Sequence, residues 1–119
     1  MKILIAEDDF PSDLMLTRTL KEISREVLHV KTGVEAIDAC RNNPDLDLVL
    51  MDICMPGMSG YDATRQIRQF NKEVIIIAQT AEVIVGSRKM AIEAGCNDYI
   101  EKPIDQDELM GLIHKHFNK

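Results

Sequence analysis

The stretch from residue 46 to residue 52 reads Leu46-Asp47-Leu48-Val49-Leu50-Met51-Asp52, an almost unbroken apolar run that ends on an acid. A short apolar run of this kind is typical of a strand buried on both faces of a parallel sheet. We therefore predict strands over Leu46–Met51 and over the similar runs Lys2–Ala6 and Val74–Ala78. The more polar segments Glu26–Val30 and Asp98–Glu101 suit strands at the two edges of the sheet.

Helical stretches with recognisable start signals separate these predicted strands. Thr32 and Glu35 have the spacing of a capping box, in which side chains bind free backbone N–H groups at a helix start. The same spacing recurs in Ser59 with Asp62 and in Asp105 with Glu108. A further helix is expected to begin near Asp9, and another to end at Gly95 with a left-handed cap. The chain thus alternates between strand and helix.

This alternation, repeated five times over residues 1–119, predicts a single α/β domain. Because strand–helix–strand crossovers are right-handed, the five strands should form a parallel sheet with helices on both faces. We predict the flavodoxin-like, doubly wound (βα)5 fold with strand order 2-1-3-4-5. A dinucleotide-binding Rossmann fold would carry a GxGxxG turn after its first strand. Here that turn reads Glu7-Asp8-Asp9 and would repel a pyrophosphate.

The composition excludes several functional classes. The 119 residues carry 14 basic and 20 acidic side chains, a net charge of −6, which argues against direct binding of nucleic acid through a basic face. The apolar runs are much shorter than the roughly 18 residues of a membrane-spanning helix, so we expect no membrane contact by this domain. The three cysteines form no CxxC pair, as expected of reduced thiols in a cytoplasmic protein.

Polar side chains follow several predicted strands, at the edge of the sheet where the strands end. Glu7 and Asp8 follow the first strand, Asp52 the third, Thr80 the fourth and Lys102 the fifth. Since the carboxyl ends of parallel strands meet at one edge, we expect these groups to converge there. Crowded carboxylates are the oxygen ligands that Mg²⁺ prefers, and an aspartate can attack phosphorus to give an aspartyl phosphate. Lys102 and Thr80 would then bind the phosphoryl oxygens.

The segments around these residues resemble the receiver domain of two-component response regulators, and the resemblance covers the whole chain. The matching segments are Ile3-Leu4-Ile5-Ala6-Glu7-Asp8-Asp9, Leu50-Met51-Asp52-Ile53-Cys54-Met55-Pro56-Gly57-Met58-Ser59-Gly60, Thr80-Ala81 and Gly95-Cys96-Asn97-Asp98-Tyr99-Ile100-Glu101-Lys102-Pro103-Ile104. The pattern is similar to that of chemotaxis regulators. Gln79, directly before Thr80, is more similar to the receiver domains of hybrid sensor histidine kinases than to stand-alone regulators.

The resemblance implies a role for each residue of the acidic site. Asp52 would be the phosphoacceptor, and Lys102 would contact the phosphoryl group. Asp8 and Asp52 would bind Mg²⁺, or Mn²⁺ in its place, directly. Glu7 would bind the ion through a water molecule, and Cys54 would bind it through its backbone carbonyl.

The resemblance also implies a conformational switch. Thr80 and Tyr99 would form it, because the tyrosine of the family turns inward when the threonine hydroxyl moves to the phosphoryl group. Three further residues lie where the family tunes the lifetime of the phosphoryl group: Cys54, Ala81 and Glu82. The Lys102–Pro103 peptide bond would be cis.

The function implied by the resemblance is phosphorylation-controlled signalling in a two-component system or phosphorelay. A phosphohistidine on a histidine kinase or a histidine phosphotransfer domain would donate its phosphoryl group to Asp52 in a Mg²⁺-dependent reaction. The domain would catalyse its own phosphorylation and a slow autodephosphorylation, without being an enzyme in the ordinary sense. Its last two helices would contact an output domain or a second copy of the chain.

Two other functions are alternatives. A phosphatase with an aspartyl nucleophile usually carries a second acid two residues after the first, where this chain has Cys54, a thiol that is a poor general acid for an alkoxide. A phosphorylation-independent interaction module would be expected to have lost an acid, the acceptor or the lysine, and all of these remain here.

Overall fold

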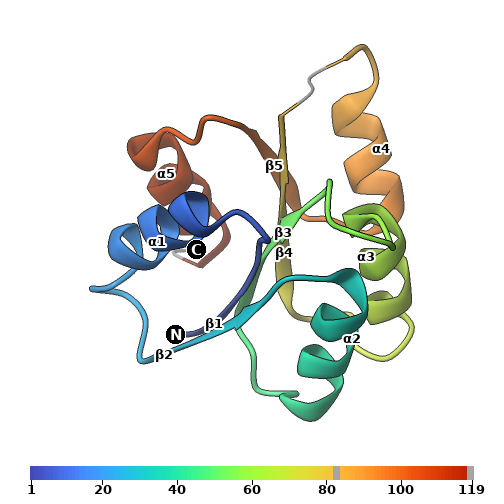
Figure 1. Cartoon of the computed structure of the whole chain (residues 1–119), viewed down its shortest axis with the longest axis horizontal. Helices are drawn as coiled ribbons and strands as arrows, with labels where there is room; N and C mark the ends of the chain where they lie inside the picture. The colour runs from blue at the N-terminus through green and yellow to red at the C-terminus, as the bar shows by residue number, and fades with distance from the viewer. Residues whose placement is uncertain (82–83, 118–119) are drawn as a thin grey trace.

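The computed structural model describes residues 1–81 and 84–117, and over this part of the chain it contains five strands and five helices in alternation (Figure 1). The strands are β1 (Lys2–Ala6), β2 (Glu26–Val30), β3 (Leu48–Asp52), β4 (Ile75–Thr80) and β5 (Asp98–Glu101). They form one sheet in the order β2-β1-β3-β4-β5, and each neighbouring pair is parallel. The predicted flavodoxin-like topology is confirmed, including the two polar strands at its edges.

Helices cover both faces of this sheet. They are α1 (Phe10–Thr19), α2 (Gly33–Asn42), α3 (Gly60–Arg68), α4 (Ser87–Ala94) and α5 (Gln106–Phe117). Helices α1 and α5 lie against one face, and α2, α3 and α4 lie against the other (Figure 1). Across the described ranges, no helix has the length and apolar character needed to cross a bilayer.

The helix starts lie where the capping signals predict them. Asp9, Thr32, Ser59 and Asp105 each accept a hydrogen bond from the backbone N–H group three residues later, at distances of 3.0 to 3.2 Å. Each bond satisfies a donor that has no partner within the first turn of its helix. Gly95 ends α4 with a φ of 111°, a left-handed conformation that glycine adopts without strain.

Two central strands begin and end later in the chain than their apolar stretches predict. β3 extends through Asp52, and β4 extends through Gln79 and Thr80. The reason is backbone pairing, because Asp52 lies opposite Gln79 in the parallel ladder and Thr80 lies opposite Glu101. Ladder hydrogen bonds join backbone groups whatever the side chains are, so these strands carry polar side chains to the edge of the sheet.

Alternation of side chains along the strands directs three polar residues at the strand ends to one face of the sheet. The buried side chains on the face under α1 and α5 include Ile3, Ile5, Leu48, Leu50 and Ile77. Because every second side chain of a strand points to the same face, continuing this alternation directs Glu7, Asp52 and Gln79 to the α1/α5 face as well. These three polar groups lie where the apolar core ends and the carboxyl edge of the sheet begins.

Candidate functional site

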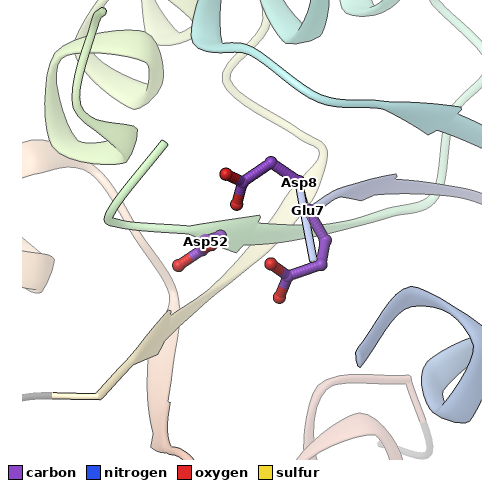
Figure 2. Close-up of side chains that lie close together, drawn as sticks. All are labelled: Glu7, Asp8 and Asp52. Atoms are coloured by element: carbon purple, nitrogen blue, oxygen red, sulfur yellow. The ribbon is translucent and has the colours of Figure 1, made fainter. Parts of the chain in front are cut away.

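Three carboxylates converge at the carboxyl ends of the neighbouring strands β1 and β3 (Figure 2). Glu7 and Asp8 directly follow β1, and Asp52 is the last residue of β3. One carboxylate oxygen from each of the three lies within 4.8 Å of the other two. Glu7 and Asp52 are buried, whereas Asp8 is exposed. The structure thus brings these predicted site residues together in a cluster that is open to solvent on the side of Asp8.

Lys102 provides positive charge to this cluster. Its ammonium lies 2.7 Å from Oε1 of Glu7 and 3.4 Å from Oδ2 of Asp52, so one lysine joins the ends of β1 and β3. It reaches them from the segment after β5, where the Lys102–Pro103 peptide bond is cis, as the family resemblance predicts. The sequence places Lys102 near the site, but its close ion pair with Glu7 is a finding of the structure.

Burial and neighbouring charges shift the pKa values of two groups in this cluster. Burial, the largest influence, raises the pKa of Glu7 from its usual 4.5 to about 7. The hydrogen bond from Lys102 opposes this rise, and the neighbouring Asp52 adds to it. For Lys102 burial alone would lower the pKa, but the hydrogen bond with Glu7 and the charge of Asp52 outweigh burial and raise it. Glu7 and Lys102 therefore both keep their protons to a higher pH than usual.

The donor set fits a hard divalent cation. Glu7, Asp8 and Asp52 offer carboxylate oxygens, which are the ligands that Mg²⁺ prefers, and they offer no soft thiolate or imidazole ligand. Mg²⁺ usually takes one or two carboxylates and keeps several waters, which suits a cluster with one exposed member. These residues could hold Mg²⁺ at the open side of the cluster.

Asp52 is held in place by the loop that follows it. Its Oδ1 accepts a hydrogen bond from the backbone N–H of Cys54 at 3.2 Å, while the side chain of Cys54 is exposed. Gly60, the first residue of α3, packs directly against the same strand end, because a Cβ atom at this position would collide with the carbonyl of Asp52. Gly60 belongs to a motif noted in the sequence, but this close approach could not be seen there.

Thr80 is buried at the end of β4 and faces a small pocket. The pocket has a volume of about 110 Å³, and Cys54 and Ile84 line it together with Thr80. Ala81, the next residue, is exposed. Glu82, which was expected to tune the phosphoryl lifetime, lies outside the described residues. The structure therefore places Thr80 and the backbone after Asp52 around a shared space.

Tyr99 is the second residue of β5, and its side chain lies beside α4. It is half-buried, and its ring centroid is 5.9 Å from the guanidinium carbon of Arg88. The ring lines a surface groove of about 530 Å³, to which Ile84 and Ile92 also contribute. Ile84 lines both this groove and the pocket at Thr80, so it is shared by the surroundings of Tyr99 and Thr80, the two predicted members of the switch.

Comparison with known proteins identifies the family. The model of the response regulator receiver domain matches residues 3–114. This chain belongs to that family.

Relatives of this receiver domain occur in proteins of different lengths. The sensor histidine kinase GacS of Pseudomonas protegens is 36% identical over 94% of the chain, which spans 13% of the length of that kinase. Two-component response regulator 24 of Arabidopsis thaliana is 33% identical over 94% of the chain, which spans 81% of that protein. Similar receiver sequences therefore occur both in sensor kinases and in short regulators.

Solved structures share the fold closely. The receiver domain of the sensor histidine kinase PA1611 of Pseudomonas aeruginosa, which has a magnesium ion coordinated in its active site cleft, is 32% identical with a TM-score of 0.88. The match covers 99% of this chain and 98% of that one. A co-crystal structure of the Saccharomyces cerevisiae phosphotransfer protein Ypd1 with the receiver domain of Ssk1 matches at 31% identity and a TM-score of 0.88. This match covers 97% of this chain and 87% of that one.

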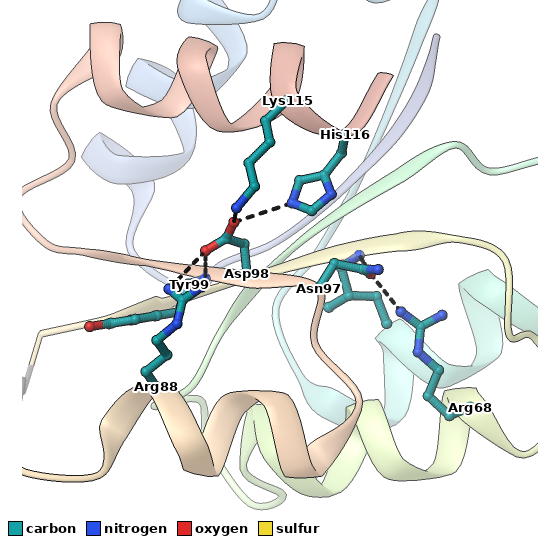
Figure 3. Close-up of polar contacts among 8 residues, drawn as sticks. Arg68, Arg88, Asn97, Asp98, Tyr99, Lys115 and His116 are labelled. Carbon is teal, nitrogen blue, oxygen red and sulfur yellow. Dashed lines mark hydrogen bonds and ion pairs between the residues drawn. The ribbon is translucent and has the colours of Figure 1, made fainter. Parts of the chain in front are cut away.

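A further buried acid in this receiver domain, Asp98 of β5, lies outside the acidic cluster and was not singled out from the sequence. Its carboxylate lies 3.2 Å from both Lys115 and His116 of α5, and 3.5 Å from Arg88 of α4 (Figure 3). Its Oδ1 also accepts a hydrogen bond from the backbone N–H of Tyr99 at 3.0 Å. Burial alone would raise the pKa of Asp98, but the hydrogen bonds from the Tyr99 backbone, His116 and Lys115 outweigh burial and lower it.

The partners of Asp98 come from two helices on opposite faces of the sheet, so no local spacing in the sequence links them. From the sequence, basic residues in the last turn of α5 could equally be interpreted as solvated charges that interact with the end of the helix. A buried position for Asp98 could have been inferred from its place at the start of a strand, but its partners could not.

Proposed function

We propose that Asp52 is the phosphoacceptor of this receiver domain and takes its phosphoryl group from a phosphohistidine in a Mg²⁺-dependent reaction. The observation that carries the proposal is the convergence of three carboxylates within 4.8 Å around a lysine that contacts two of them. An aspartate can serve as a nucleophile toward phosphorus, and phosphoryl transfer needs mainly positioning and neutralisation of charge. The cluster offers both.

In the proposed transfer, a carboxylate oxygen of Asp52 forms a bond with phosphorus while the bond from phosphorus to the donor histidine nitrogen breaks. The bonding electron pair stays on the imidazole nitrogen, which then takes up a proton from water. The Lys102 ammonium neutralises and binds the phosphoryl oxygens, and the hydroxyl group of Thr80 donates a hydrogen bond to them. Support comes from the position of the Lys102 ammonium, 3.4 Å from Oδ2 of Asp52, and from the place of Thr80 at the end of the adjacent strand β4.

Asp8 and Asp52 are proposed as direct ligands of Mg²⁺, with Glu7 acting through a water molecule and Cys54 through its backbone carbonyl. Asp8 is exposed and open to an incoming ion, while Glu7 is buried and already paired with Lys102. When bound, the ion would neutralise the carboxylates and the incoming phosphoryl oxygens. Mn²⁺ should substitute, because it accepts the same oxygen ligands.

The proposed switch runs from Thr80 to the surface formed by α4, β5 and α5. Ile84 borders both the pocket at Thr80 and the groove that holds Tyr99, so a shift of Ile84 would change the surroundings of the tyrosine ring. Through Arg88 and Asp98 the same surface is connected to α5. We infer that phosphorylation alters this surface, where an output domain or a second copy of the chain would bind.

The donor is proposed to dock beside the acidic site, over α1 and the segment after β5. Phe10 at the start of α1 is 74% exposed. A neighbouring pocket of about 340 Å³ is lined by Pro11, Met15 and Ile104, and by Lys102 of the site itself. Exposed apolar residues next to a reactive group suit a transient contact with a histidine kinase or a histidine phosphotransfer domain.

Two remaining expectations accompany this proposal. The phosphoryl lifetime is expected to depend on Cys54, Ala81 and Glu82, and the first two are exposed where an attacking water would approach. The three cysteines are free thiols, which supports a reducing compartment such as the cytoplasm.

The test is phosphorylation by acetyl phosphate, and binding of beryllofluoride, in the presence of Mg²⁺. Wild type should be modified, Asp52→Asn should not, and Asp98→Asn, which changes a buried carboxylate outside the acidic cluster, should be modified like wild type. Intact mass reports the modification directly. Equal labelling of Asp52→Asn would refute the acceptor assignment.

Beryllofluoride binding and a phosphomonoester hydrolysis assay test the two alternative functions. A wild-type protein that ignores both Mg²⁺ and beryllofluoride would be a phosphorylation-independent interaction module. Multiple-turnover hydrolysis of a phosphomonoester would identify a phosphatase.

A further inference from the structure

Gln79 lies in β4 directly before Thr80 and has no exposed surface. Neither the oxygen nor the nitrogen of its side-chain amide has a hydrogen-bond partner within the described part of the chain. Burying an amide without a partner destabilises a folded protein, and nearly all buried polar groups are paired. A buried, unpaired amide therefore points to a partner that Gln79 acquires in another state of the domain.

The strand register places Gln79 in one row with the acidic site. In the parallel ladder Asp52 lies opposite Gln79, and Gln79 lies opposite Ile100. Side chains at one level of a sheet point to the same face, and Ile100 belongs to the core under α1 and α5. The Gln79 amide thus lies on the face that carries Asp52, one strand away, at a strand spacing of about 5 Å.

Lys102 reaches the acidic site by crossing β4. It follows β5, the neighbour of β4, yet its ammonium contacts Asp52 of β3 and Glu7 of β1. Its backbone N–H donates to the carbonyl of Thr80 at 2.8 Å, which fixes the base of the lysine side chain beside β4. Lys102 follows two residues after Ile100, the register partner of Gln79, and its ammonium lies 3.4 Å from the carboxylate of Asp52, the other register partner of Gln79.

We propose that Gln79 is a positioning residue whose amide oxygen accepts a hydrogen bond from the Lys102 ammonium when the phosphoryl site is occupied. This inference rests on the proposed function of Asp52. A cation held by Asp8 and Asp52, with Glu7 binding it through water, would compete with Lys102 for the charge of Glu7 and weaken the attraction that holds the ammonium 2.7 Å from Glu7. A lysine has three N–H donors, so the ammonium can bind Gln79 with one and phosphoryl oxygens with the others.

This role predicts opposite effects on stability and on the phosphorylated state. Gln79→Met replaces the amide with an apolar side chain of similar length, so the unphosphorylated protein should be as stable as wild type or more stable. Binding of beryllofluoride with Mg²⁺ should weaken by about tenfold, which corresponds to one hydrogen bond to a charged group. A purely structural role would lower stability and leave beryllofluoride binding unchanged.

The experiment measures beryllofluoride affinity by calorimetry in excess Mg²⁺ and stability by urea unfolding without Mg²⁺. Gln79→Leu serves as a second apolar variant, and Gln69→Met, at the exposed C-terminal end of α3, as the matched control. In wild type the side-chain amide signals of Gln79, assigned by their loss in Gln79→Met, should shift in ¹⁵N–¹H spectra when beryllofluoride is added.

Three results would overturn the role of Gln79: unchanged beryllofluoride affinity in both apolar variants, a loss of stability in both, or amide signals that do not move. In each of these cases wild type still binds beryllofluoride, so the proposed function of Asp52 stands. If wild type fails to bind beryllofluoride, the proposed function falls and the role of Gln79 falls with it.

Discussion

Buried carboxylates occur in two regions of this domain, and their charges are balanced in opposite ways. At the carboxyl edge of the sheet, the cluster of Glu7, Asp8 and Asp52 has Lys102 as its basic partner within the described ranges. On β5, the single carboxylate of Asp98 has three basic partners, from α4 and α5. The pKa of Glu7 is raised to about 7, mainly by burial, whereas for Asp98 the hydrogen bonds outweigh burial and lower the pKa.

The balance of charge distinguishes a binding site from a structural ion pair. An acid whose charge is fully compensated has little affinity for an added cation, and its partners hold secondary-structure elements together. Carboxylates that outnumber their basic partners repel one another, and a bound cation relieves this repulsion. The acidic cluster is thus suited to bind Mg²⁺, and the contacts of Asp98 are suited to join α4, β5 and α5.

The largest expected contrast is in Mg²⁺ binding. Asp8→Asn should weaken Mg²⁺ binding by on the order of 100-fold or more, because it removes a charged ligand from the cluster. Asp98→Asn should bind Mg²⁺ like wild type, since Asp98 lies outside the cluster. Isothermal titration calorimetry checks both variants, and an equal loss in the two would remove the distinction between the regions.

The next largest effect is the pH dependence of stability due to Glu7. The unfolded chain loses this proton near pH 4.5 and the folded protein near pH 7, so stability falls as pH rises through that window. The loss is about 3 kcal/mol, at roughly 1.4 kcal/mol for each pH unit. Urea unfolding of wild type without Mg²⁺ should show this slope, and Glu7→Gln should lack it. Equal slopes would show that Glu7 is not the group responsible.

Asp98 should have a smaller effect of opposite sign. Because its pKa is lowered, its contribution to stability is present above its unfolded pKa of 3.8 and is lost as pH falls through the lower folded pKa. Asp98→Ala should cost about 2 kcal/mol at pH 7, because the Tyr99 N–H and the basic side chains lose their acceptor. The cost should fade in strong acid. Urea unfolding at pH 7 and pH 2.5 measures it, and a cost independent of pH would contradict an ionic origin.

The smallest effect is expected for an exposed ion pair. Nη1 of Arg65 and Oδ1 of Asp62, both in α3, are 2.6 Å apart, which is shorter than any distance from the carboxylate of Asp98 to its partners. Both side chains of this pair are more than half exposed. Arg65→Ala should change the free energy of unfolding by less than about 0.5 kcal/mol, since water screens such pairs. Urea unfolding beside Asp98→Ala provides the comparison. A loss as large as that of Asp98→Ala would show that burial is not what separates the two regions.

Much of the site could be predicted from strand ends alone. Glu7, Asp8, Asp52, Thr80 and Lys102 each follow or end a strand, and parallel strands bring their carboxyl ends to one edge. The contact between Lys102 and Glu7 could not be predicted, because the length and flexibility of a lysine side chain allow several partners along that edge. The exact ends of β3 and β4 were also missed, since hydropathy does not report backbone pairing.

The amino-acid sequence was enough to predict the order of strands and helices, the helix caps and the edge of the sheet at which the polar groups gather. These follow from local patterns and from the right-handed crossover, which leave few arrangements open. The tertiary structure was needed to show which acids are compensated and which are in excess, where Tyr99 lies, and that the amide of Gln79 is buried with no hydrogen-bond partner among the described residues. Those properties depend on which side chains from distant segments meet, and distances across a folded sheet are not encoded in any local spacing.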